Sequence, residues 1–154
     1  MPMAITEQLN ALGIQIPPVP QALAAYIPSK RSGNIIFTSG QLPLVAGKLS
    51  KTGKVGKNIT LSEAQAEAKQ CLLNALSTVL LHINSLDQVK SVVKLGVYVA
   101  CTENFTEQHL VANGASELVV QIFGDKGKHA RFAIGVSSLP LDACVELEMT
   151  VEVE

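Results

Sequence analysis

Apolar and polar side chains alternate without interruption in the C-terminal segment, residues 144–153. A two-residue period is typical of a β-strand that buries one face, so this segment predicts a strand with an apolar face and an acidic face. The polar positions of this strand are Glu146, Glu148, Thr150 and Glu152.

Residues 129–137 predict a second strand, in which Arg131 shares one face with the small residues Ala133 and Gly135. The opposite face carries Phe132, Ile134 and Val136. A guanidinium stays protonated and presents five donors in a rigid fork, so burying it without a partner is strongly unfavourable. We therefore expect Arg131 to have an anion as its partner. The alternation leaves open whether its face meets the acidic face of residues 144–153.

Two segments have the spacing of amphipathic helices. The first runs from Thr60 to about His82 and begins with Thr60-Leu-Ser-Glu63, which has the form of a capping box. Its apolar residues are Leu61, Ala64, Ala68, Cys71, Leu72, Ala75, Leu76, Val79 and Leu80. The second helix is predicted from the spacing of Val111, Ala115, Leu118 and Ile122. Gly124 and Gly127 are expected to end it.

The remaining segments complete an α+β pattern. A strand is predicted from Val89 to Ala100, with an apolar face formed by Val89, Val93, Leu95, Val97 and Val99. Extended runs on either side of Gly33-Asn34, between Ala24 and Ser39, predict a hairpin. The order hairpin, helix, strand, helix, strand, strand predicts a mainly antiparallel sheet with two helices packed on one face.

The N-terminal residues 1–23 predict an arm outside this core. Ile5 to Leu12 have the pattern of a short helix that Gly13 stops, and the Pro-rich stretch that follows favours extended backbone. No break in composition divides the 154 residues, so we expect residues 1–154 to form a single domain.

The composition indicates an oligomer. Hydrophobic residues make up 47% of the chain and charged residues only 16%, whereas about 25% is usual for charged residues. The net charge of -1 and the absence of Trp argue against a nucleic-acid partner. The one basic segment, Lys48 to Lys57, is rich in glycine and is expected to be a solvated turn.

Neither a metal site nor a membrane segment is expected. The three cysteines have no paired spacing, and the three histidines, which are His82, His109 and His129, are predicted to be ordinary surface or loop residues. No apolar stretch approaches the roughly 20 residues that span a bilayer, and the first residues lack the pattern of an export signal. A protein of the reducing cytoplasm is therefore predicted.

Several separated blocks resemble one known family. The blocks are Gly33-Asn-Ile-Ile-Phe-Thr-Ser39-Gly-Gln41, Ala130-Arg131, Leu139-Pro140 and Val145-Glu146. They resemble the Rid family of reactive-intermediate deaminases, which are also called YjgF-like proteins or, by an older label, L-PSP endoribonucleases. With Asn113-Gly-Ala-Ser116 and Phe123-Gly124 before the arginine, the chain is most similar to the longer branch of that family.

The resemblance implies a chorismate-mutase-like α+β subunit that assembles as a homotrimer, with clefts between neighbouring chains. It also implies hydrolysis of enamine or imine intermediates, such as 2-aminoacrylate, to a 2-oxo acid and ammonia. No cofactor and no metal is implied. The expected ligands are small 2-imino and 2-oxo carboxylic acids.

The resemblance also implies roles for individual residues. Arg131 would bind the substrate carboxylate, and Glu146 would position water and transfer protons. The substrate-binding positions would be Tyr26, Ser39, Gly40 and Asn113. For these four, simpler roles stay open: packing for Tyr26, a turn for Ser39-Gly40, and the start of a helix for Asn113.

Two other functions remain open at this point. Shorter members of the family often have a cysteine where this chain has Ala133, and Phe132 replaces a small polar residue. These differences allow a trimeric regulatory protein that binds 2-oxo acids without turnover. The older family label implies an endoribonuclease or translation inhibitor, for which residues 48–57 are the only basic segment.

Overall fold

The structure, a computed structural model, describes residues 3–19 and 25–154 and contains a five-stranded sheet in the order β1-β2-β5-β3-β4. Its strands are β1 (Ser29–Ser32), β2 (Ile35–Thr38), β3 (Val89–Ala100), β4 (Ala130–Val136) and β5 (Val145–Val153). The α-helices of the described residues are α1 (Ile5–Ala11), α2 (Leu61–Val79) and α3 (Gln108–Phe123). Short 3-10 helices are η1 (Leu86–Gln88), η2 (Gly124–Gly127) and η3 (Pro140–Asp142).

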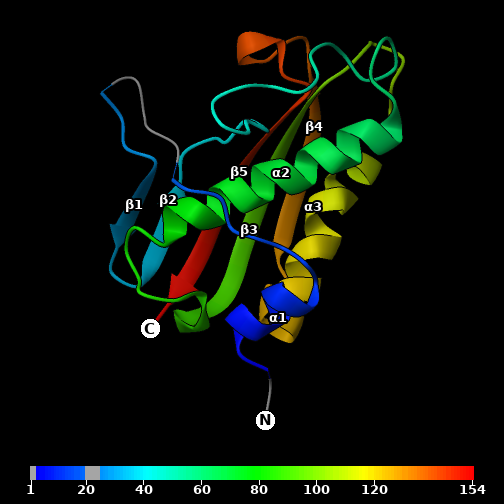
Figure 1. Ribbon diagram of the computed structural model, residues 1–154. Helices are drawn as coiled ribbons and strands as arrows, with labels where there is room; N and C mark the ends of the chain where they lie inside the picture. The colour runs from blue at the N-terminus through cyan, green and yellow to red at the C-terminus, as the bar shows by residue number, and fades with distance from the viewer. Residues whose placement is uncertain (1–2, 20–24) are drawn as a thin grey trace.

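Helices α2 and α3 cross the same face of the sheet, and α1 lies near one end of α3 (Figure 1). All neighbouring strands pair antiparallel except β3 and β4, which are parallel. The chain therefore crosses over from β3 to β4 through α3, as parallel pairing requires. The predicted α+β class, with a mainly antiparallel sheet and two helices on one face, is confirmed.

The predicted capping box starts α2. The Thr60 hydroxyl accepts a hydrogen bond from the backbone N–H of Glu63 at 3.1 Å, and the Glu63 carboxylate accepts one from the backbone N–H of Thr60 at 3.0 Å. These two bonds satisfy N–H groups that have no partner within the helix. The apolar stripe of α2 packs against the sheet, and Leu72, Leu76 and Val79 are fully buried there.

The apolar face of β3 differs from the prediction at one position. Val93 was expected to share the buried face with Leu95, but its side chain is 40% exposed, and Val92 is buried in its place. The cause is an irregularity in the pairing with β5, where Val92 lies opposite Val151 and Lys94 lies opposite Thr150. The extra residue reverses the alternation, as β-bulges do.

The N-terminal arm is more firmly attached than expected. Leu9 of α1 is only 8% exposed and belongs to the main apolar core, so the prediction of an arm outside the core is wrong for this helix. The Gln8 side chain donates to the carbonyl oxygen of Gln121, and the Ile5 N–H donates to Asp87. Residues 1–2 and 20–23 of the predicted arm, and Ala24 of the predicted hairpin, lie outside the described residues.

Helices α2 and α3 approach each other closely at Gly114. A Cβ atom on this residue would overlap the backbone carbonyl of Gln65 in α2. The Gln65 side chain donates to the carbonyl of Leu110 in α3 at 2.9 Å, which fixes the register of the two helices. Only a residue without a side chain fits at this crossing.

We expect Gly114→Ala to lower the free energy of unfolding by about 2 kcal/mol, because overpacking against backbone outweighs the better helix propensity of alanine. Denaturant titration of the purified protein measures this change. Glu117→Ala, at an exposed position of the same helix, is the matched control and is expected to be neutral or slightly stabilising. A stabilised Gly114→Ala variant would contradict the close approach.

Candidate functional site

Arg131 lies near the start of β4, opposite Leu95 of β3, and its side chain extends toward α3. Its Nη1 atom donates to the Asn113 side-chain oxygen at 2.9 Å and to the Ser116 hydroxyl at 3.1 Å. Both partners are neutral oxygens. Among the described residues, no carboxylate lies within salt-bridge distance of this guanidinium. The half-buried cation is therefore held in position without being neutralised.

Arg31, the other arginine of the chain, provides a contrast. Its Nε, Nη1 and Nη2 atoms donate to the backbone carbonyls of Gly33, His82 and Glu154, at 2.9, 3.2 and 3.1 Å. All three nitrogens are used, and the residue ties β1 to the chain terminus. Arg131 uses Nη1 alone, so its Nε and Nη2 donors have no partner among the described residues.

Asn113 and Ser116 lie one turn apart on α3, which places both side chains on the same side of the helix. The alternative interpretation of Asn113 as a helix-start residue is wrong, because α3 begins at Gln108. Asn113 instead contacts Arg131. Ser116 was not predicted as a site residue, although its spacing from Asn113 was a signal that could have indicated it.

His129 also belongs to this cluster. Its Nε2 atom is 2.9 Å from the Ser116 hydroxyl, and its Nδ1 atom is 2.6 Å from the carbonyl oxygen of Gly127. His129 lies in the loop between η2 and β4, as predicted, and its side chain is partly buried there. Its position two residues before Arg131 was a signal that could have indicated it, but its contact with Ser116 depends on the fold, because η2 separates it from α3.

Glu146 lies on β5 directly opposite Tyr98 of β3. Its carboxyl group touches Gly40, where an added Cβ would lie 3.0 Å from the Glu146 Oε2 atom. Gly40 and Glu146, both predicted site residues, are thus brought together. Burial raises the pKa of the Glu146 carboxyl, and the negative charge of Glu148 raises it further. A raised pKa makes a carboxylate a stronger base, which suits a group that accepts and returns a proton.

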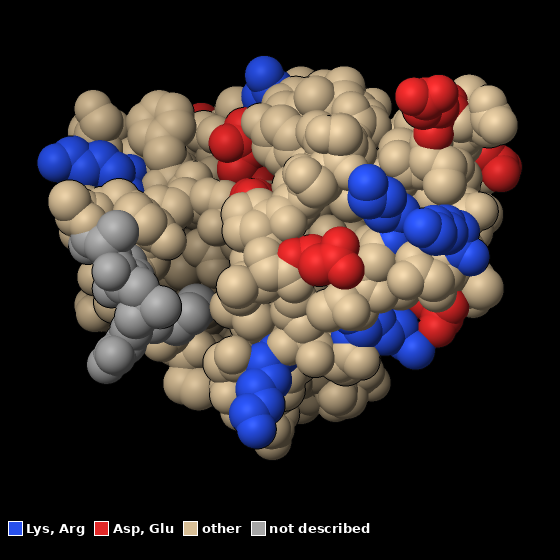
Figure 2. Space-filling view, turned by 90° about the horizontal axis from the view of Figure 1, so that it is seen from above, with Lys and Arg blue, Asp and Glu red and all other residues tan. Residues whose placement is uncertain are grey.

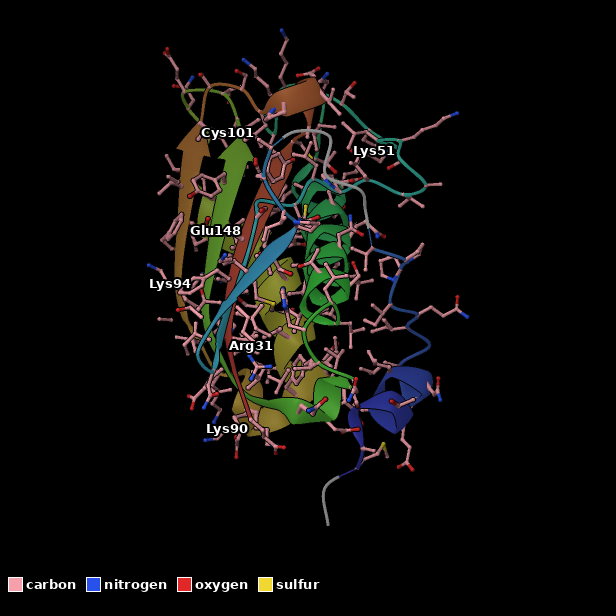
Figure 3. The ribbon with its side chains drawn as sticks, turned by 90° about the vertical axis from the view of Figure 1, so that its left-hand side faces the viewer. Arg31, Lys51, Lys90, Lys94, Cys101 and Glu148 are labelled. Atoms are coloured by element: carbon pink, nitrogen blue, oxygen red, sulfur yellow. The ribbon has the colours of Figure 1, made fainter. Side chains whose placement is uncertain are left out.

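Glu148, Lys94 and Phe132 surround Tyr98 and Gly96 on the same face of the sheet. The rings of Tyr98 and Phe132 meet edge to face at 5.3 Å, and the Lys94 ammonium lies over the Phe132 ring. Glu148 and Lys94 lie on the side of the sheet away from the helices (Figure 3). Burial, followed by the charge of Glu148, raises the pKa of Tyr98.

The two principal candidates therefore lie on opposite faces of one sheet. Arg131 points to the face covered by α3, while Glu146 points to the open face with Tyr98. The face of β4 that carries the small residues Ala133 and Gly135 also lies toward the helices. An added Cβ on Gly135 would contact Cys101 and Gln108. One chain does not bring Arg131 and Glu146 together.

Ser39 and Tyr26 lie at the β1–β2 hairpin. The Ser39 hydroxyl donates to the Ile27 carbonyl at 2.6 Å, and its backbone N–H donates to the Pro28 carbonyl at 2.8 Å. Ser39 therefore fixes the segment that carries Tyr26. The Tyr26 side chain is 57% exposed, so a packing role within the chain is not supported. Both residues lie at the same end of β2 as Gly40.

Two of the three cysteines, Cys71 and Cys144, are poorly suited to act as nucleophiles. Cys71 and Cys144 are fully buried, and burial raises the pKa of the Cys144 thiol to about 12. Such a thiol stays protonated at neutral pH and is a poor nucleophile.

The described residues contain no group of three or more metal-binding side chains. No described helix is both long and apolar enough to cross a lipid bilayer.

Charged side chains are sparse on the surface. Figure 2 shows one face on which lysines, arginines and acidic residues are scattered among mostly uncharged atoms. On the open face of the sheet, Phe37 and Ile134 are each 47% exposed. Lys51, in the basic segment of the sequence, is paired with Glu63 at 2.6 Å.

The family of this chain is established by comparison. A family model described as "YjgF/chorismate_mutase-like, putative endoribonuclease" matches residues 6–153. The chain therefore belongs to the YjgF-like, or Rid, family, and the resemblance seen in the sequence is confirmed.

Two relatives match nearly the whole chain. Protein TCP17 of Trypanosoma cruzi is 41% identical over 149 residues, which are 96% of this chain and 93% of the relative. A crystal structure of Atu1372 from Agrobacterium tumefaciens, described as a protein with unknown function, is also 41% identical. It superposes with a TM-score of 0.91 and covers 98% of this chain and 94% of the other.

A more distant relative bears on location. The mitochondrial protein MMF1 of Saccharomyces cerevisiae is 28% identical over 130 residues, or 84% of this chain and 76% of the relative. The family thus has a member outside the cytoplasm. A cytoplasmic location for this chain stays a prediction.

We expect Glu148→Gln to lower the pKa of Glu146, because the negative charge that disfavours ionisation of Glu146 is removed. Part of the elevation should remain, since burial is the larger cause. Titration of the labelled Glu146 carboxyl by carbon NMR measures the shift. Glu152→Gln is the matched control, because Glu152 lies farther along the same face and pairs with Lys90. Equal shifts in the two variants would contradict direct coupling.

Proposed function

We propose that the protein hydrolyses small 2-imino and 2-enamino acids, such as 2-aminoacrylate, to the 2-oxo acid and ammonia. The proposed site is composite: Arg131 comes from one chain and Glu146 from its neighbour in a homotrimer. Membership of the YjgF-like family supports this assignment. The low charge content and the exposed apolar residues of the open face support assembly.

The observation that carries the proposal is the separation of the two groups within one chain. Arg131 extends toward α3, and Glu146 touches Gly40 on the other side of the sheet. A substrate of only a few heavy atoms cannot contact both faces at once. A second copy that brings its Glu146 side to the edge beside Arg131 supplies the missing group.

Arg131 is suited to bind a small carboxylate. Its Nη1 atom is held by Asn113 and Ser116, while Nε and Nη2 have no partner among the described residues. A carboxylate can accept two parallel hydrogen bonds from such an arginine, and each hydrogen bond to a charged group contributes about 1.5 to 3 kcal/mol. Asn113 is in this proposal a positioning residue rather than a ligand of the substrate.

Glu146 is suited to transfer protons. The enamine carbon must first take up a proton to give the imine, after which water adds to the imine carbon and the C–N bond breaks to release ammonia. Each step moves a proton, and the raised pKa of the Glu146 carboxyl makes it a better proton acceptor than an ordinary glutamate. Gly40 leaves room for this carboxyl, and we propose that Ser39 and Tyr26 line the same side of the cleft.

We expect Arg131→Ala to lower kcat/KM for 2-aminoacrylate about a hundredfold or more, because two charge-assisted hydrogen bonds are lost. Arg131→Lys should recover little, since an ammonium lacks the planar fork.

Glu146→Gln should lower kcat by about a hundredfold or more. Release of the 2-oxo acid from freshly generated substrate is the measurement. Arg31→Lys, at the structural arginine, is a control for general damage.

A mixing experiment tests the composite site directly. If Arg131→Ala and Glu146→Gln chains are dissociated together and reassembled at equal amounts, about a quarter of the wild-type activity should return in a closed ring. A site is intact when its arginine comes from one variant and its glutamate from the other. In a random mixture, half of the chains that supply Arg131 to a site keep this arginine, and half of the neighbours that supply Glu146 keep this glutamate. Both are intact in one quarter of the sites.

Three results would count against the proposal. No recovery on mixing, while each variant alone reassembles normally, would contradict a site shared between chains. No acceleration of any small imino acid over buffer would exclude the deaminase. Binding of pyruvate without turnover would favour a regulatory protein that senses 2-oxo acids.

A further inference from the structure

We infer that His129 and Ser116 form a directed hydrogen-bond relay that orients Arg131 and leaves its Nε–Nη2 edge as the surface that receives an anion. Both are positioning residues, because neither has to touch the ligand. The inference rests on the proposed function only in taking that anion to be a small carboxylate.

The relay begins at the backbone of Gly127. The His129 Nδ1 atom is 2.6 Å from the Gly127 carbonyl oxygen, and a carbonyl oxygen can only accept a hydrogen bond. Nδ1 must therefore carry the proton. This carbonyl is fixed in place, since η2 packs tightly on α3 and an added Cβ on Gly127 would lie 2.6 Å from the Val119 carbonyl oxygen.

The proton on Nδ1 determines the direction of the next bonds. In the neutral imidazole Nε2 is then an acceptor, and at 2.9 Å it takes the hydroxyl proton of Ser116. Because the Ser116 hydroxyl proton is directed to His129, the lone pairs of the Ser116 oxygen are free to accept a hydrogen bond from Arg131. It accepts the hydrogen bond from Nη1 of Arg131 at 3.1 Å.

The end of the relay fixes which donors of Arg131 remain. Nη1 has two hydrogens, and the contacts with Asn113 and Ser116 use both. The two hydrogens of Nη2 and the one on Nε have no acceptor among the described residues. Because the guanidinium is planar, these donors form a single edge that matches the two oxygens of a carboxylate.

Nitrogen NMR of the ligand-free protein tests the relay without reference to activity. We expect neutral His129 to be in the tautomer protonated at Nδ1, with its Nε2 signal changed in Ser116→Ala. His109, exposed on the same helix, serves as the internal reference for an unconstrained ring. A His129 ring protonated at Nε2 would overturn the direction of the relay.

Ligand binding tests the positioning role. Ser116→Ala should raise the Kd for pyruvate, measured by calorimetry, and the KM for 2-aminoacrylate about tenfold, while kcat changes less than about twofold. Ser116→Thr keeps the hydroxyl and should restore both constants. Ser62→Ala and His109→Gln, at exposed positions of α2 and α3, are matched controls that should leave Kd and KM unchanged.

The outcomes separate this inference from the proposed function. If Arg131→Ala abolishes turnover but Ser116→Ala changes neither Kd nor KM, the positioning role is wrong and the deaminase stands. If the wild-type protein binds pyruvate without turnover, the deaminase fails and the relay is judged from the tautomer and the Kd. A protein that neither binds pyruvate nor turns over imino acids overturns the assignment of the free edge.

Discussion

The proposed site depends on the side of the sheet to which β4 directs its only cation, Arg131. Arg131 points toward α3, where two neutral oxygens hold it but do not neutralise it. A positive charge that is partly withdrawn from water and has no counter-ion is unfavourable unless an anion joins it. The fold therefore stabilises Arg131 just enough to orient it, and the remaining donors stay available for a ligand. Arg31, whose three nitrogens all bind backbone carbonyls, shows the opposite use of the same side chain.

The open face of the sheet carries Glu146, the second of the two proposed catalytic groups. Glu146, Glu148 and Tyr98 lie close together there, and burial and like charge both favour the protonated form of Glu146. The low charge content of the chain is consistent with the proposed assembly through the open face. A surface that packs against a neighbouring chain can carry apolar residues such as Phe37 and Ile134. In the proposed function, anion binding and proton transfer therefore lie on different faces of one small subunit.

The sequence was sufficient to predict the elements but not their relative placement. The alternation of β5 and the capped stripe of α2 are local patterns, and both were predicted correctly. The bulge at Val93 depends on pairing with β5, so the local pattern gave the wrong face. The partners of Arg131, which are Asn113 and Ser116, could not be predicted from alternation either, because they lie on α3 and meet Arg131 only when that helix packs on the sheet.

The connection from α3 to β4 has a consequence for how such a protein can diversify. Helix α3, η2 and β4 follow one another along the chain, and this stretch contains Asn113, Ser116, His129 and Arg131. The glutamate lies on a separate strand. In the proposed function, substitutions on α3 can therefore alter the surroundings of Arg131 alone, whereas changes in β4 also reach Tyr98, beside Glu146, through Phe132.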